Sequence, residues 1–215
     1  MLVHLVKKDF MLAKKYWLIM LIAAIAVPFF LHTRTGPAAG GSLSFFLSTL
    51  YIAFLLFNAV SMMDYKYRGA ALLCTTPYTR SAIVQARYLF VLAVFLGCYV
   101  LYTLTILLSP VQADTLGISD TVRAFFAITL IFAVMIPIQY RFGYEKSRLI
   151  FFLLVFLLPF GLSTLRESVQ VPDMLAAVPL PLPPFALDLL LVLLALLIAG
   201  LSMRISVRIF SKISF

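Results

Sequence analysis

Side chains suited to acid-base, nucleophilic or metal chemistry are scarce in this chain of 215 residues. The only histidines are His4 and His32, and the only cysteines are Cys74 and Cys98. Neither pair has the spacing of a metal site, two cysteines make no disulfide framework, and no set of nucleophile, base and orienting group can be assembled. We therefore expect no catalytic residue and no metal site, and we interpret both cysteines as apolar packing residues.

Groups that could power transport directly are equally scarce. The sequence contains no G-x-x-x-x-G-K-[ST] phosphate loop, so ATP hydrolysis on this chain is not expected. No Asp or Glu falls at the centre of an apolar run, and Asp188, near one end of the last run, comes closest. This distribution argues against a proton-coupled or ion-coupled pump, because such pumps use acidic groups inside the membrane.

The composition places the chain in a membrane. Hydrophobic residues make up 64% of it, charged residues 12%, and the mean hydropathy is +1.10. A soluble fold of this length could not bury so many apolar side chains. The net charge of +9 could indicate nucleic acid, but the basic residues occur in short clusters between apolar runs, so we expect no nucleic-acid partner.

Six apolar runs are long enough to cross a bilayer as helices, since about 20 apolar residues span the hydrocarbon. The sequence thus predicts an all-α polytopic membrane protein with a single transmembrane domain over residues 1–215. We expect the first run to be a retained span and not a cleaved signal. The predicted spans are residues 15–33, 43–63, 84–108, 122–140, 149–165 and 185–203.

The basic residues predict the orientation. Fourteen of the 17 Lys and Arg fall on one side of these spans, and only Arg34, Arg123 and Arg166 fall on the other. By the positive-inside rule the richer side is cytoplasmic, which puts both termini inside the cell. We expect a multi-pass protein of the plasma membrane, in a bacterium.

Residues 1–14 have the pattern of an amphipathic interfacial helix, with apolar residues on one arc and Lys7, Lys8, Lys14 and the following Lys15 on the other. Asp9 projects into the apolar arc. We place Asp9 at the watery edge of that arc, the alternative being that it pairs with a basic group.

Two connections on the basic side are informative. In the segment from Asp64 to Tyr88, Ala70–Cys74 can form a short helix, Pro77 stops it, and Ser81–Arg87 restarts a helix into the third span. The alternative is an ordinary loop carrying topology charges. The second connection, 137–148, is tight and turns at Gly143, while the outer segment 166–184 is too rich in proline for a continuous helix and forms a surface or re-entrant element.

Four groups of residues together carry a resemblance to a known family. They are the opening L-V-K-K-D-F with its following Lys pair; Asp64, Lys66, Gly69, Leu73, Pro77, Arg80, Ile83, Ala86, Arg87 and Tyr88; Pro137, Arg141, Phe142, Gly143, Glu145, Lys146 and Arg148; and Ser202 and Ser206 before a basic tail. In these residues the chain resembles the membrane subunits of the type-2 class of ABC exporters, in their small six-span branch. The resemblance covers nearly the whole chain, and its nearest branch is the subunits that export phenol-soluble modulins, which are short amphipathic helical peptides.

The resemblance implies that residues 64–83 form a coupling loop that docks on a separate cytoplasmic ABC ATPase subunit. ATP and Mg would bind that partner, with no cofactor on this chain, and the pathway would need a second copy of the chain or a close homologue, with a homodimer expected. The implied docking residues are Lys66, Arg68, Gly69, Leu73, Pro77 and Arg80, and those of the second cytoplasmic loop are Arg141, Gly143, Glu145, Lys146 and Arg148.

Polar positions in the second and third spans are candidates for the translocation path, or else they pack and hydrogen-bond between helices. A mostly apolar lining suits a lipid-like or amphipathic cargo, and the other partners expected are membrane lipids. A membrane immunity or sensory protein that binds a partner, or a small integral membrane enzyme, is the alternative function. The candidate path residues are Tyr51, Asn58, Tyr99, Tyr102 and Thr103.

Overall fold

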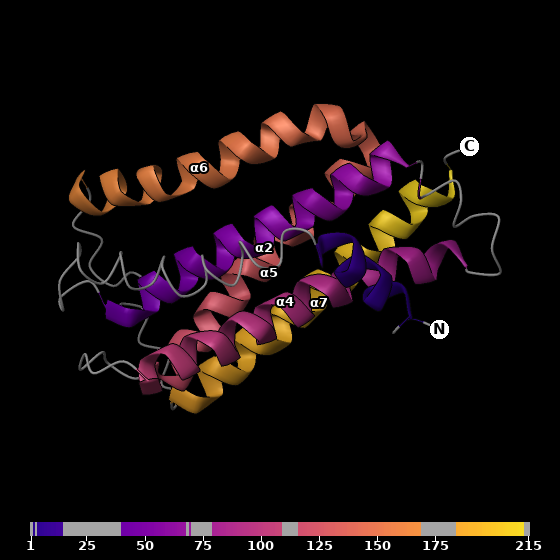
Figure 1. Cartoon of the computed structure of the whole chain (residues 1–215). Helices are drawn as coiled ribbons and strands as arrows, with labels where there is room; N and C mark the ends of the chain where they lie inside the picture. The colour runs from indigo at the N-terminus through magenta and orange to yellow at the C-terminus, as the bar shows by residue number, and fades with distance from the viewer. Residues whose placement is uncertain are drawn as a thin grey trace.

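The computed structural model describes residues 2, 4–14, 40–67, 69, 79–108, 116–168 and 184–212, and all regular structure in these segments is helical (Figure 1). This confirms the all-α prediction for that part of the chain. A helix over residues 4–14 precedes five long helices, which are α2 (Gly40–Lys66), α4 (Arg80–Leu108), α5 (Ile118–Phe142), α6 (Tyr144–Ser168) and α7 (Pro184–Ser211).

Four of these helices are long and apolar enough to cross a membrane. They are α2, α4, α5 and α7, of 25 to 29 residues, which at 1.5 Å per residue reach about 37 to 43 Å and exceed a hydrocarbon core of about 30 Å. They correspond to the second, third, fourth and sixth predicted spans. The fifth, 149–165, lies within α6, whereas the first, 15–33, and residues 169–183 of the predicted outer loop lie outside the described residues.

Helix α2 is the most buried of these four helices. It contacts α4, α5 and α6, and 61% of its most apolar 18-residue stretch is buried, against 11% of the corresponding stretch of α7. Aromatic side chains join it to its neighbours: the ring of Phe45 lies 5.1 Å from that of Tyr102 on α4, and Phe57 lies 5.5 Å from Phe132 on α5. Helix α6 runs beside α2 at one side of the bundle, away from α4 and α7 (Figure 1).

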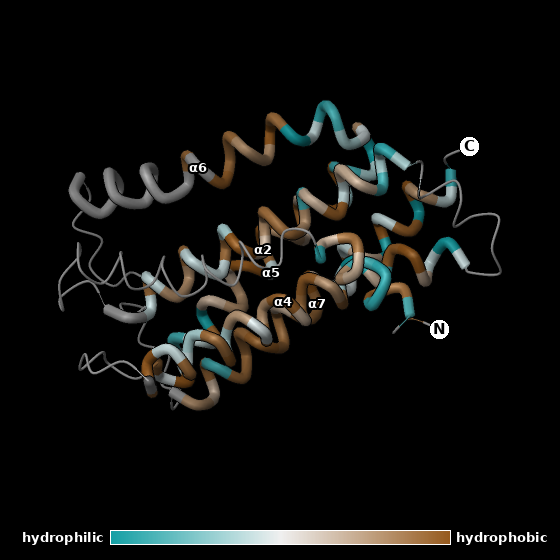
Figure 2. Tube along the Cα trace, viewed as in Figure 1, coloured by the Kyte–Doolittle hydropathy of each residue, from teal (hydrophilic) through white to brown (hydrophobic). Residues whose placement is uncertain are grey.

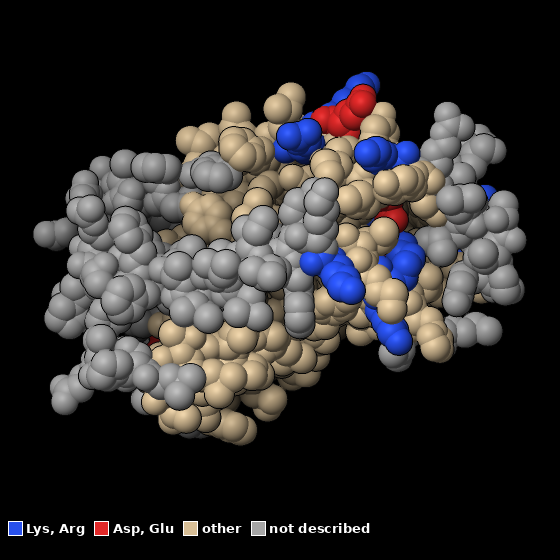
Figure 3. Space-filling view, in the orientation of Figure 1, with Lys and Arg blue, Asp and Glu red and all other residues tan. Residues whose placement is uncertain are grey.

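The helix ends on the basic side lie close together. Arg80, at the start of α4, donates a hydrogen bond of 2.7 Å to the carbonyl of Ser211, at the end of α7. Tyr65, at the end of α2, donates one of 2.8 Å to Glu145, at the start of α6. Hydrophilic residues concentrate at this end (Figure 2), and the basic side chains visible in Figure 3 lie over it. The described residues that the sequence predicts to be cytoplasmic thus lie at one end of the bundle. That this end is on the cytoplasmic side of the membrane stays a prediction.

A hydrogen-bonded contact fastens α4 and α5 to α7. The hydroxyl of Tyr88 lies 2.7 Å from that of Ser202 and 3.0 Å from that of Ser206, both on α7. Ser202 in turn donates to the carbonyl of Ala133 on α5. Both serines are buried, so these bonds satisfy polar groups that would otherwise have no partner in an apolar environment.

We predict that Ser202→Ala lowers the free energy of unfolding in detergent or bicelles by about 0.6 to 2 kcal/mol, because it removes the bridge between α4, α5 and α7. Ser211→Ala is the matched control, since the exposed Ser211 hydroxyl bonds only within its own helix. Equal stability of the two variants would show that the bridge contributes nothing.

Candidate functional site

An ion pair closes the base of the connection between α2 and α4. Asp64 lies in the last turn of α2 and Arg87 in the second turn of α4, and the guanidinium of Arg87 donates to the Asp64 carboxylate. Helix α2 continues through Lys66 and α4 begins at Arg80, and the coupling role of residues 64–83 stays a prediction. The predicted helix restart over Ser81–Arg87 is confirmed.

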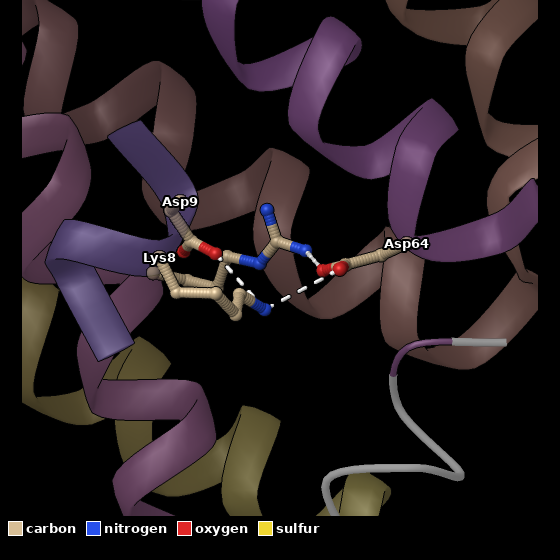
Figure 4. A network of polar contacts seen from close by, with 4 residues as sticks. Lys8, Asp9 and Asp64 are labelled. Atoms are coloured by element: carbon tan, nitrogen blue, oxygen red, sulfur yellow. Dashed lines mark hydrogen bonds and ion pairs between the residues drawn. The ribbon is translucent and has the colours of Figure 1, made fainter. Parts of the chain in front are cut away.

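The N-terminal helix adds two charges to this ion pair. Lys8 Nζ lies 3.1 Å from Asp9 Oδ1 and 3.3 Å from Asp64 Oδ1. Figure 4 shows the side chains of Lys8, Asp9 and Asp64 turned toward one another. We call Lys8, Asp9, Asp64 and Arg87 the charge cluster; its two cations and two anions come from three separate helical segments.

The expected position of Asp9 at the watery edge of its helix is wrong. Its relative exposure is 3%, and it faces Lys8 in the interior of the cluster, which is the alternative that the sequence left open. A carboxylate on the apolar arc of a helix can be buried only beside a positive charge, because desolvating an isolated charge is too costly. The only sign of this site in the sequence was an acidic residue, Asp9, on the apolar arc of a helix. Nothing in the sequence indicated that Arg87 lies close to Asp9.

Burial makes the charge cluster electrostatically strong. Arg87 is 9% exposed, and the Asp64 side chain 17% exposed. The Arg87 guanidinium also lies 5.9 Å from the centroid of the Phe57 ring, and Asp9 and Tyr140 lie within its electrostatic range. In such a setting, removal of one partner leaves an uncompensated charge, so each member holds the others in place.

Two of the predicted docking residues contact structural groups at this end. A Cβ on Gly69 would lie 2.6 Å from Asp64 Oδ1, so any side chain there would displace that carboxylate. Arg80 holds the last carbonyls of α7, at 3.5 Å from Phe210 O and 2.7 Å from Ser211 O. Lys66 is exposed, with its Nζ 5.7 Å from the Tyr67 ring centroid. The others, Arg68, Leu73 and Pro77, lie outside the described residues.

The second connection, between α5 and α6, consists of a single residue. Helix α5 ends at Phe142 and α6 begins at Tyr144, and between them Gly143 has φ 78°, a left-handed conformation that glycine adopts without strain. The predicted turn at Gly143 is confirmed. The other four residues of this predicted site are exposed; they are Arg141, Glu145, Lys146 and Arg148. Of these, Glu145 accepts the hydrogen bond from Tyr65.

The candidate path residues do not gather at one place. Asn58 accepts a hydrogen bond of 3.0 Å from Tyr144 on α6, whereas Tyr99 and Tyr102 both pack on Phe45. Phe45 and Asn58 are thirteen residues apart on α2, about 20 Å along the helix axis. Tyr51 is half-buried on α2, and the exposed Thr103 hydroxyl bonds within α4. Their role in translocation stays a prediction.

Apolar helices of membrane-crossing length, with charged helix ends gathered at one end, define a multi-pass integral membrane protein. The sequence matches the family described as ABC-2 family transporter protein over residues 4–211, and the chain belongs to that family. It is therefore a transporter membrane component, a class that normally works with an ATPase subunit. Comparisons with curated proteins and with solved structures find no match.

We predict that Asp64→Asn and Arg87→Met each lower the free energy of unfolding by about 1.5 to 3 kcal/mol, because each removes a charge-assisted hydrogen bond to a buried partner. The double variant should lose less than the sum of the two by about 1 to 3 kcal/mol, since the two residues interact directly. Unfolding in bicelles measures both quantities.

Lys66→Met is the matched control for these variants. It removes an exposed charge two residues beyond Asp64 and should change the free energy of unfolding by less than about 0.5 kcal/mol. Strict additivity of Asp64→Asn and Arg87→Met would contradict the pairing.

Proposed function

We propose that this chain is the membrane subunit of an ATP-driven exporter and that a separate ATPase chain docks on the connection between α2 and α4. Membership of the ABC-2 family supports the transporter class over the immunity, sensory and enzyme alternatives. The sequence carries no phosphate loop, so the energy source would be the partner, with ATP and Mg bound there.

The charge cluster is the observation that carries the coupling proposal. It ties the end of α2 to the start of α4, the two helices that flank the connection, and it ties both to the N-terminal helix. A force applied to the connection by a moving ATPase would therefore reach three helical segments together. The subunit would then shift between two states whose populations the ATPase controls.

The pathway itself would form between two copies of this chain, or between this chain and a close homologue. Only 11% of the most apolar 18-residue stretch of α7 is buried, and α6 packs mainly against α2 and α5, so large apolar faces remain available to lipid or to a second copy. The cargo we propose is an amphipathic peptide, such as a phenol-soluble modulin, or a lipid-like molecule; Tyr51, Tyr99 and Thr103 are the path residues we would test first.

We predict that Gly69→Pro and Arg80→Glu leave membrane insertion intact but reduce transport by at least about tenfold, the effect of losing about 1.4 kcal/mol at the docking contact. The measurement is export by vesicles containing the chain and its ATPase, together with ATP hydrolysis. In both variants the ATPase should still hydrolyse ATP, but its rate should be the same with and without the membrane subunit.

Arg208→Glu is the control for Arg80→Glu. It places the same negative charge near the C-terminal end of α7, where it is unfavourable, but on α7 and not on the segment between α2 and α4, so transport should stay near the level of the unmodified protein. Normal transport by both Gly69→Pro and Arg80→Glu would remove the coupling assignment. Failure of the chain to copurify with any phosphate-loop ATPase from its own cells would overturn the exporter proposal as a whole.

A further inference from the structure

A narrow apolar cavity of about 310 Å³ lies between α4, α5 and α7. Side chains from all three helices line it, among them Leu92 on α4, Ile136 on α5 and Leu196 on α7, and Leu2 approaches it from the N-terminal segment. Leu92 and Leu196 are 38% and 55% exposed, so the cavity opens sideways on the surface that faces lipid. None of the coupling or path residues that the structure describes lines it.

The cavity extends along the membrane normal by about the depth of one leaflet. On α4 it runs from Gln85 to Phe95, ten residues or about 15 Å, which is half of a hydrocarbon core of about 30 Å. Its Gln85 and Met203 end is the one near the basic helix termini, and Phe95 lies toward the middle of the bundle. The cavity therefore begins at the membrane surface and ends near the midplane.

Polar chemistry is confined mainly to the surface end. Gln85 and the Tyr88 hydroxyl lie there, and the exposed Arg204 follows Met203 on α7. Deeper in, Thr129 is the one residue with a polar side chain among the described residues that line the cavity. An apolar slot whose surface end lies at the same level of α7 as an exposed cation matches an anionic headgroup with an attached hydrocarbon chain.

We infer that the cavity binds one acyl chain of an anionic phospholipid from the leaflet on the basic side, with the lipid phosphate near Arg204. A helix of the same length, from a second copy or an amphipathic peptide, would fill about 1,200 Å³, several times the cavity volume. An extended acyl chain is much thinner, and the lateral opening lets it enter without leaving the bilayer. This site needs only the membrane position of the chain, and it does not rest on the proposed function.

The test uses phosphatidylglycerol with a photoactivatable diazirine near the methyl end of one acyl chain, incorporated into phosphatidylcholine nanodiscs that contain the full chain. After illumination, mass spectrometry should find adducts enriched at Phe95 and Thr129 over Leu153, which is exposed on α6 outside the cavity. Uniform labelling of the exposed apolar residues would overturn the inference.

Two variants that fill the cavity from different helices, Ala199→Leu and Thr129→Leu, should each reduce labelling at Phe95 by about tenfold, since each displaces about two methylene groups of the ligand. Gly97→Leu is the control, because a Cβ at Gly97 meets nothing within 4 Å and the cavity is not lined by this residue. Unchanged labelling in both filled variants would contradict the site.

Arg204→Gln tests the headgroup. It should lower labelling by the phosphatidylglycerol probe by about fivefold, the effect of one cation near the membrane surface, and should leave labelling by the matching phosphatidylcholine probe unchanged. Displacement of the lipid by an amphipathic helical peptide, or crosslinking of Leu92→Cys to a second copy, would assign the cavity to cargo or to an interface and overturn the lipid assignment.

Discussion

The buried guanidinium of Arg87 is the constraint on which the basic end of the bundle depends. An arginine in the second turn of a membrane-crossing helix has to be neutralised, and Asp64 provides one carboxylate while Asp9 provides another nearby. Because these acids come from α2 and from the N-terminal helix, neutralising Arg87 also fixes where those segments lie. Lys8 then balances the second acid. One electrostatic requirement thus determines the arrangement of three helical segments.

Further contacts at the basic end of the bundle support the charge cluster. Gly69 is small where the Asp64 carboxylate approaches the backbone, and Arg80 holds the last carbonyls of α7. Tyr88, one residue after Arg87, bonds to Ser202 and Ser206 on α7. The start of α4 is therefore bound on one face by ions and on another by hydroxyl groups, which makes it a firm base for the connection that precedes it.

Much of the fold could be predicted from the sequence, because bilayer thickness imposes a length on apolar runs that is independent of their packing. The four apolar helices of sufficient length and the turn at Gly143 followed from hydropathy and from glycine chemistry. The candidate site could not be predicted to the same extent. Asp9 and Arg87 are 78 positions apart, and one sequence shows a misplaced charge without showing its counter-ion. Arg80 was expected to contact the ATPase partner. Its hydrogen bond to the end of α7 joins residues far apart in the sequence, so the sequence alone does not indicate it.

The most direct measurement of whether the charge cluster holds these segments as one unit is the distance between spin labels at Met11 and Tyr67, both exposed, with Cys74 and Cys98 replaced by serine. Pulsed electron paramagnetic resonance should give one narrow distribution that keeps its mean when an ATPase partner and nucleotide are added. Arg87→Met should broaden it. A mean that shifts with nucleotide in the unmodified cluster, or a distribution that Arg87→Met leaves narrow, would contradict a rigid unit.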